Sequence, residues 1–335
     1  RLAVEDIHAK GGVEIGGKKY TIELLAQDDA AEPKQGTIAA QKIVDHGKVL
    51  GVIGHYNSGV TMAANPVYAK ANLFTITPSA SNPDVVAKAM KTASGSNSAY
   101  RMVAHDGMQG PAMAAYANKI GIKKVAIIDD ATTYGKGLAD KFEAKAKELG
   151  MEVVYREAAT DKTTDFKAIL TKVKSTGADG LVWGGLDDTA ATFTKQAREL
   201  GLTQKILMFD AVCTDNYITL AGDSSVGTLC SVTGVPLSEM PEGAAFKERF
   251  EKRFNGQKMQ GFAPFAYDAV YTVVEAIKKA GTTDDSAKVA AAMEGIQAKG
   301  LSGNIAFEPS GERKDGMITI LEQKGKEFVP IDKAR

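Results

Sequence analysis

Short apolar segments of the chain alternate with longer stretches in which apolar residues recur every three or four positions. The short segments are apolar almost throughout, which is typical of strands that are covered on both faces. The longer stretches predict helices, and strands alternating with helices form right-handed βαβ units on a parallel sheet. The pattern therefore predicts an α/β protein. The predicted strands are residues 20–27, 49–54, 73–77, 124–130, 152–157, 180–185 and 205–211.

The alternation runs twice along the chain. A first series ends in the polar stretch at residues 94–107, and a second begins near residue 123. After residue 234 the pattern changes to two long predicted helices, 244–255 and 264–280, and the last part predicts hairpin strands around the turn at residues 308–316. We therefore expect two lobes of one kind, with the chain crossing between them more than once.

Charge and composition exclude several classes of protein. The chain has 335 residues, enough for two cores, and its 41 Lys and Arg balance 41 Asp and Glu. A nucleic-acid or anionic-membrane partner would need a clustered basic face, so neither is expected. No apolar run reaches the roughly 20 residues that span a bilayer. The four His lack metal-ligand spacing, and no dinucleotide, P-loop or nucleophile-elbow motif occurs, so no metal or cofactor is expected.

Two polar clusters follow neighbouring predicted strands. Residues 54–66 read GHYNSGVTMAANP, and residues 76–85 read ITPSASNPDV. Ser and Asn are preferred helix caps, so both clusters are consistent with two ordinary helix starts. In open α/β sheets, however, ligands bind outside the carboxyl ends of the strands. The residues alone leave both interpretations open, and a cap with a spare donor satisfies both.

Cys213 and Cys230 are the two cysteines of the chain. They are too few for a zinc site. Composition alone leaves two buried thiols and a disulfide equally open, because the choice depends on the compartment.

Eight segments of the chain form an ordered set of motifs: 2–12, 28–35, 52–59, 77–83, 109–116, 134–140, 165–170 and 196–202. This set resembles the branched-chain amino-acid binding proteins of ABC importers, the leucine/isoleucine/valine type. The resemblance implies the type I periplasmic binding fold, with two doubly wound Rossmann-like lobes joined by three hinge crossovers. Residues 1–104 and 235–313 would form the N-terminal lobe, and 105–234 and 314–335 the C-terminal lobe. The family has a strand before the first helix, so we expect that strand to be absent from this sequence.

The resemblance also implies a site for the carboxylate and ammonium of a free α-amino acid. Ser58 would offer its hydroxyl and backbone N–H to the carboxylate at a helix start. The turn of Ser79, Ala80 and Ser81 would offer a carbonyl to the ammonium and a hydroxyl between both groups. Two helix N-caps are the alternative interpretation of these residues.

The second lobe would supply Tyr134, Leu186 and Asp210. The Tyr134 hydroxyl would reach the carboxylate, although a half-buried Tyr that packs a helix start is the alternative. Asp210 would accept from the ammonium, with a helix cap as the weaker alternative. Leu186 replaces an aromatic residue that well-known family members carry, which leaves the side-chain preference open. Tyr56 and Phe262 could line the same pocket or belong to the core.

We therefore expect a solute-binding protein, and not an enzyme, that captures a branched-chain or other aliphatic amino acid and delivers it to a membrane ABC permease. The family implies a monomer exported to the periplasm, with its signal peptide outside this sequence, and export favours a Cys213–Cys230 disulfide. Three alternatives stay open: a ligand-sensing domain of a receptor or regulator, a binder of an amide or short carboxylate, and an α/β enzyme. The enzyme lacks a visible nucleophile–base pair.

Overall fold

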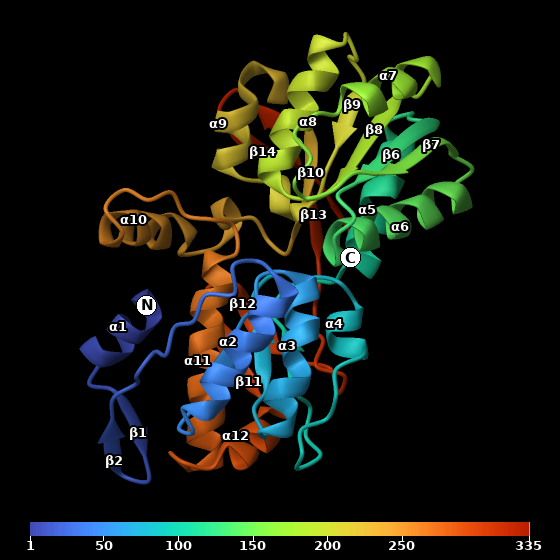
Figure 1. Cartoon of the computed structure of the whole chain (residues 1–335). Helices are drawn as coiled ribbons and strands as arrows, with labels where there is room; N and C mark the ends of the chain where they lie inside the picture. The colour runs from blue at the N-terminus through green and yellow to red at the C-terminus, as the bar shows by residue number, and fades with distance from the viewer. Residues whose placement is uncertain (335) are drawn as a thin grey trace. The chain divides into compact units, whose positions relative to one another are not determined.

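The computed structural model describes residues 1–334, which fold into two compact units (Figure 1). Unit 1 contains Arg1–Val103 and Leu237–Asp315, and unit 2 contains residues 104–236 and the chain from Gly316 onward. The chain thus passes from one unit to the other three times within the described residues. Each unit combines helices with a parallel sheet, which confirms the predicted α/β class.

Unit 2 is built on a mostly parallel sheet. In the described part of the chain this sheet has seven strands in the order β14-β13-β10-β9-β8-β6-β7. The strands from β7 to β10 are parallel to their neighbours, whereas β13 and β14 run antiparallel at the other edge. The bounds are β6 (Lys124–Asp129), β7 (Glu152–Ala158), β8 (Gly180–Gly184), β9 (Lys205–Leu207), β10 (Leu229–Thr233), β13 (Ile318–Lys324) and β14 (Glu327–Ala334).

Helices cover both faces of this sheet (Figure 1). Val125 and Ile127 of β6 pack on one face with residues of α5 and α6, and Ala126 and Ile128 pack on the other with α7, α8 and α9. Successive side chains of a strand point to opposite faces, so a strand buried on both must be apolar throughout. The bounds are α5 (Asp106–Lys119), α6 (Thr133–Glu148), α7 (Lys167–Ser175), α8 (Asp187–Glu199), α9 (Asp215–Ala221), and the 3₁₀ turns η1 (Asp210–Val212) and η2 (Gly222–Ser225).

Unit 1 has a smaller parallel sheet. Within residues 1–334 its strands lie in the order β3-β4-β5, and two separate antiparallel hairpins, β1-β2 and β11-β12, accompany it. The helices α2 and α3 share an apolar cluster with β3, and α11 contacts β3 and β4. The strands are β1 (Val13–Ile15), β2 (Lys18–Tyr20), β3 (Val52–Ile53), β4 (Thr75–Thr77), β5 (Ala99–Arg101), β11 (Gln297–Gly300) and β12 (Gly303–Ala306). The helices are α1 (Leu2–Ala9), α2 (Pro33–Asp45), α3 (Ser58–Lys70), α4 (Asp84–Ala87), η3 (Leu237–Glu239), α10 (Gly243–Arg253), α11 (Ala263–Ala280) and α12 (Ser286–Met293).

Two predicted elements are wrong. The strand expected at residues 20–27 contributes only Tyr20 to β2, because residues 21–29 pair with no strand in the described chain and a strand requires a hydrogen-bonded neighbour. The hairpin expected around residues 308–316 is reduced to one antiparallel bridge between Phe307 and Arg313. That segment leads from unit 1 to unit 2, and the two hairpins instead turn at 301–302 and 325–326.

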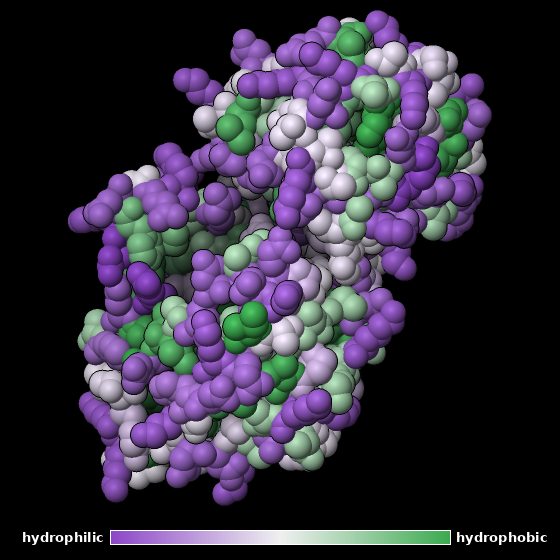
Figure 2. Space-filling view, viewed as in Figure 1, coloured by the Kyte–Doolittle hydropathy of each residue, from purple (hydrophilic) through white to green (hydrophobic). Residues whose placement is uncertain are grey.

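Hydrophilic residues cover most of each unit's face in Figure 2, and hydrophobic residues lie between them in small groups. Large apolar side chains that are well exposed, such as Leu24 and Val226, occur singly in the sequence. Among residues 1–334, no helix is both long and apolar enough to cross a bilayer.

Candidate ligand-binding site

The two polar clusters of the sequence meet in unit 1. They follow β3 and β4, which are adjacent parallel strands, so their carboxyl ends lie at the same edge of the sheet. The Oγ atom of Ser58, the first residue of α3, accepts a hydrogen bond from the backbone N–H of Asn82 at 3.3 Å. The Ser79 hydroxyl donates to the carbonyl oxygen of Tyr56 at 3.0 Å. The strands thus place both clusters side by side, and we call Tyr56, Ser58 and residues 79–82 the serine cluster.

The turn after β4 is held by its own side chains. Oγ1 of Thr77 accepts from the backbone N–H of Ala80 at 2.9 Å and donates to the carbonyl of His55 at 2.8 Å. Ser81 is fully buried, and its Oγ atom has no hydrogen-bond partner among residues 1–334. A buried polar atom without a partner typically costs about 1–3 kcal/mol. The Ser81 hydroxyl is therefore a ready donor or acceptor for a bound polar group.

Arg101 holds this turn through hydrogen bonds, a role that was not predicted from the sequence. Its Nη1 donates to the carbonyl oxygens of Ala80 at 2.9 Å and Asn82 at 2.7 Å. Its guanidinium also pairs with Glu312, with Nε to Oε2 at 2.9 Å. Arg101 is fully buried, so its charge is compensated entirely by these partners. The only signal in the sequence is an Arg inside the buried strand β5.

Tyr56 and Phe262 lie together in unit 1. Their ring centroids are 5.6 Å apart in an edge-to-face arrangement, which is a favourable geometry for two aromatic rings. The Tyr56 side chain is 46% exposed and Phe262 is half-buried, so neither is a core residue. The pair provides an accessible aromatic surface beside Ser58 and Ser79.

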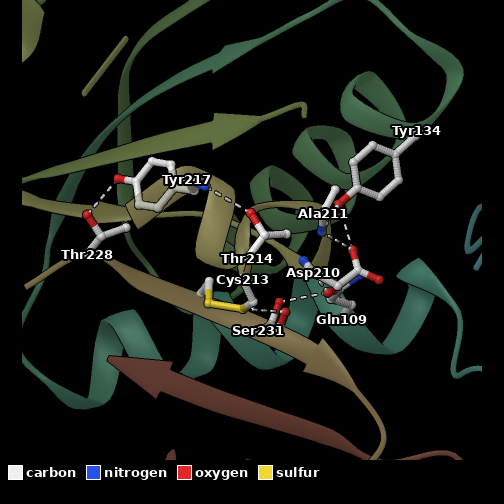
Figure 3. Close-up of a disulfide and its surroundings, with 10 residues drawn as sticks. Gln109, Tyr134, Asp210, Ala211, Cys213, Thr214, Tyr217, Thr228 and Ser231 are labelled. Atoms are coloured by element: carbon white, nitrogen blue, oxygen red, sulfur yellow. Dashed lines mark hydrogen bonds between the residues drawn. A yellow bond between two sulfur atoms is a disulfide. The ribbon is translucent and has the colours of Figure 1, made fainter. Parts of the chain in front are cut away.

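The residues predicted on the second lobe meet in unit 2. Tyr134, Leu186 and Asp210 follow β6, β8 and β9, which are neighbours in the sheet. The Tyr134 hydroxyl donates to Oδ1 of Asp210 at 2.6 Å (Figure 3). Leu186 precedes α8, is half-buried and packs against the cluster that contains Tyr134. The sheet therefore places a hydroxyl, a carboxylate and an aliphatic side chain at one edge.

Gly135 and Gly184 let α6 approach β8 closely, and this approach fixes the position of Tyr134. It stands at the start of α6, where the Thr132 hydroxyl caps the helix by accepting from the N–H of Gly135 at 2.9 Å. A Cβ atom on Gly135 would lie 2.3 Å from the carbonyl oxygen of Gly184, and a Cβ atom on Gly184 would lie 2.4 Å from that of Gly135. Only glycine permits this approach of α6 to β8. A side chain at either position would push Tyr134 away from Asp210.

Gln109 and Ser231 surround Asp210 and were missed by the sequence analysis. Nε2 of Gln109 donates to Oδ1 of Asp210 at 3.3 Å, and its Oε1 accepts from the backbone N–H of Asp210 at 3.2 Å. The Ser231 hydroxyl donates to the same Oε1 at 2.8 Å (Figure 3). Gln109 is fully buried and also donates to Asp106. We call Gln109, Tyr134, Asp210 and Ser231 the Asp210 cluster. Gln109 lies in one of the motifs that carried the family resemblance, which was its only signal.

Burial decides the electrostatics of this cluster. Desolvation raises the pKa of Asp210 to about 6, although hydrogen bonds from Tyr134 and Gln109 oppose the shift. Burial and the neighbouring Asp210 charge raise the pKa of Tyr134, so its hydroxyl remains a donor. No Lys, Arg or His pairs with Asp210 in residues 1–334. A buried carboxylate without a cation is suited to bind one.

Cys213 and Cys230 form a disulfide in unit 2, with their Cα atoms 5.9 Å apart (Figure 3). This separation is near the usual value for the bond. No group of three or more potential metal ligands lies together within residues 1–334.

A sequence profile described as periplasmic binding protein matches residues 1–327. The chain therefore belongs to the periplasmic binding protein family, which confirms the resemblance inferred from its motifs. An "Amino acid binding protein" of Pseudomonas aeruginosa is 35% identical over 97% of this chain and 84% of its own length. The "Leu/Ile/Val-binding protein homolog 1" of Brucella suis is 31% identical over 96% of this chain and 84% of its own.

Solved structures of similar proteins agree with this family assignment. The leucine binding protein LivK of Thermotoga maritima superposes with a TM-score of 0.86 at 26% identity, covering 99% of this chain and 92% of that one. LivJ of Streptococcus pneumoniae, solved with isoleucine, has a TM-score of 0.85 at 26% identity, covering 98% of this chain and 92% of that one. The chain is a solute-binding protein of the ABC-transporter type. A Rhodopseudomonas palustris solute-binding protein solved with 4-hydroxybenzoate shares the fold. Its TM-score is 0.85 at 22% identity, covering 100% of this chain and 91% of that one.

Proposed function

We propose that the protein binds a free α-amino acid with an aliphatic side chain in the periplasm and delivers it to the permease of an ABC importer. The observation that carries the proposal is Asp210. It is 5% exposed, lies at the carboxyl end of a parallel sheet and has no cationic partner in the described chain. An α-ammonium group would compensate its charge. A ligand without a cation would leave the carboxylate unpaired at a cost of several kcal/mol.

The serine cluster would bind the carboxylate of the same ligand. Ser58 lies at the start of α3, where free backbone N–H groups and the helix dipole favour an anion. Ser79 and Ser81 add hydroxyl groups, and the Ser81 hydroxyl is without a partner in residues 1–334. Hydrogen bonds between such donors and a charged carboxylate contribute about 1.5–3 kcal/mol each.

The ligand's side chain would contact apolar groups. Leu186 in unit 2 is half-buried and packs against the cluster that contains Tyr134, and the Tyr56–Phe262 pair in unit 1 lies beside Ser58 and Ser79. Neither group offers a charge or an amide to the side chain of the ligand. Relatives named for Leu, Ile and Val, and a structural neighbour solved with isoleucine, support an aliphatic residue.

The direct test is the identity of the bound molecule. Protein purified without refolding is denatured, and the small molecules released are identified by mass spectrometry. Calorimetry on stripped protein then compares L-leucine, L-isoleucine and L-valine with 4-methylpentanoate, which is leucine without its ammonium. We expect an aliphatic amino acid in the first experiment and much weaker binding of 4-methylpentanoate in the second. Release of an amide or an aromatic acid, with no binding of the three amino acids, would contradict the proposal.

A further inference from the structure

The segment that carries Asp210 is bonded to strand β10 at two points (Figure 3). At its start, the N–H of Asp210 donates to Oε1 of Gln109, which also accepts from the Ser231 hydroxyl on β10. At its end, three residues later, Cys213 is bonded to Cys230 on the same strand. Sγ of Cys213 also lies 3.4 Å from the carbonyl oxygen of Ser231.

The two points lie on opposite faces of the sheet. Cys230 and Ser231 are consecutive residues of a strand, so their side chains point in opposite directions. Cys230 packs in the cluster with α7, α8 and α9, whereas Gln109 comes from α5 on the other face. Residues 210–213 are therefore linked to side chains on both faces of β10.

Few backbone bonds hold the short segment, although the Ala211 N–H donates to the Tyr134 hydroxyl at 3.2 Å and the Val212 side chain is fully buried. Residues 210–212 form a single 3₁₀ turn without a side-chain cap, and one backbone bond joins the N–H of Cys213 to the carbonyl of Asp210 at 3.2 Å. Regular strand pairing of β9 ends at Leu207, three residues before the carboxylate. Without the disulfide, the remaining links of the turn to β10 in the described chain would be hydrogen bonds of Asp210, through Gln109 and, at 3.5 Å, to the Thr233 hydroxyl.

We propose that the Cys213–Cys230 disulfide positions the Asp210 carboxylate for a ligand ammonium by fixing the far end of segment 210–213 to β10. This inference rests on the proposed function for its ligand, but the ordering of the segment does not. The disulfide thus has a role in affinity beyond its effect on the unfolded chain. Cys213 and Cys230 are positioning residues and touch no ligand.

The first measurement needs no ligand. Hydrogen exchange at the backbone amides of Asp210 and Ala211 is compared between the full chain and the variant C213A/C230A, with Leu181 of β8 as an internal reference. We expect exchange at the two amides to become at least about tenfold faster relative to Leu181, the equivalent of losing roughly one hydrogen bond. If the variant does not fold, the dithiothreitol-reduced chain replaces it.

A control separates positioning from general stability. Leu170 of α7 is fully buried in the same apolar cluster as Val212, but no covalent bond or hydrogen bond joins it to segment 210–213 in the described chain. Leu170→Ala should lower stability by an amount similar to disulfide loss, because truncating a buried Leu leaves a cavity. Its exchange rates should rise equally at Asp210, Ala211 and Leu181. Equal rises in C213A/C230A, or no rise, would overturn the proposal.

The second measurement is binding of L-leucine and 4-methylpentanoate by calorimetry. For C213A/C230A we expect the affinity for L-leucine to fall about tenfold and the affinity for 4-methylpentanoate to fall less than about threefold. Only L-leucine has the ammonium group that Asp210 would bind. Equal losses for both probes would contradict a positioning role. If the unaltered chain binds neither probe, the proposed function fails for leucine, whereas the exchange measurement still decides whether the disulfide orders Asp210.

Discussion

The Tyr134 hydroxyl donates to Oδ1 of Asp210 across 2.6 Å, and both groups are almost fully buried. Burial and the charge of Asp210 raise the pKa of Tyr134, so the phenol stays protonated and can only stabilise the ionised carboxylate. Within residues 1–334, the second oxygen of Asp210 has one long contact, 3.5 Å from the Thr233 hydroxyl. Tyr134 therefore fixes one carboxylate oxygen and leaves the other for a cation.

Tyr134→Phe should weaken amino-acid binding and change the titration of Asp210. Loss of a hydrogen bond to a charged group typically costs about 1.5–3 kcal/mol, which corresponds to roughly tenfold to a hundredfold in affinity. The pKa of Asp210 should rise further, because the lost donor favours the charged form. Calorimetry with L-leucine and an NMR titration of the Asp210 carboxyl measure the two effects. An unchanged titration would show that the hydrogen bond does not form in solution.

The affinity for an amino acid should rise with pH in the weakly acidic range. The pKa of Asp210 in the free protein is about 6, and a bound ammonium would lower it because an opposite charge favours the ionised form. The complex then holds fewer protons than the free protein, so binding releases a proton. The affinity should increase as the pH rises towards about 6 and level off above it, by at most about tenfold per pH unit.

Calorimetry with L-leucine between about pH 4.5 and 7 tests this, because the ligand's own groups titrate outside that range. Tyr134 and Asp106, which is linked to Asp210 through Gln109, are the other ionisable groups around the carboxylate. Tyr134→Phe should move the inflection upward. An affinity independent of pH, or one that falls as the pH rises, would contradict the assignment of Asp210 as the ammonium acceptor.

Arg101→Met should destabilise unit 1. The substitution leaves Glu312 and the carbonyl oxygens of Ala80 and Asn82 without their donor, and removing one partner of a buried ion pair typically costs about 3–5 kcal/mol. Denaturant unfolding measures the loss. Lys88→Ala, which breaks the exposed pair with Asp84, is the control and should cost less than about 1 kcal/mol. Similar values for both variants would show that the Arg101 network contributes little.

The disulfide should be present in protein made in an oxidising compartment. Thiol titration of the unfolded, unreduced chain should find no free thiol, because Cys213 and Cys230 are joined. The loop that they close spans 17 positions, for which the chain-entropy model assigns roughly 3 kcal/mol of stability. Reduction should lower the free energy of unfolding by about this amount. Two free thiols would refute the bond.

The sequence predicted the sheet of unit 2 well, because strands buried on both faces are apolar throughout and helices with one apolar face separate them. The family resemblance, and not the apolar pattern, indicated Tyr134, Leu186 and Asp210 as site residues. Gln109, Arg101 and Ser231 could not be found from the apolar pattern either. Their partners are far along the chain, as the 101 positions between Gln109 and Asp210 show. Periodicity records which face a residue occupies and carries no information on distant partners.

The turn at residues 308–316 illustrates the same limit. Its Pro and Gly residues favour a turn, and strands do flank it, but β12 pairs with β11 and β13 pairs with β10 and β14. The choice of partner depends on which unit a strand belongs to. Local turn chemistry does not encode that.

The central claim is that Asp210 accepts a hydrogen bond from the ammonium of an α-amino acid. Asp210→Ala removes the one carboxylate of the proposed binding residues and leaves the serine cluster intact. Truncating one member of a buried charge pair costs about 2–5 kcal/mol, which predicts a loss of roughly thirty-fold to a few thousand-fold in affinity for L-leucine. Binding of 4-methylpentanoate, which has no ammonium, should be unchanged or improved. If calorimetry instead finds that Asp210→Ala binds L-leucine within about threefold of the unaltered protein, Asp210 is not the ammonium acceptor and the account is contradicted.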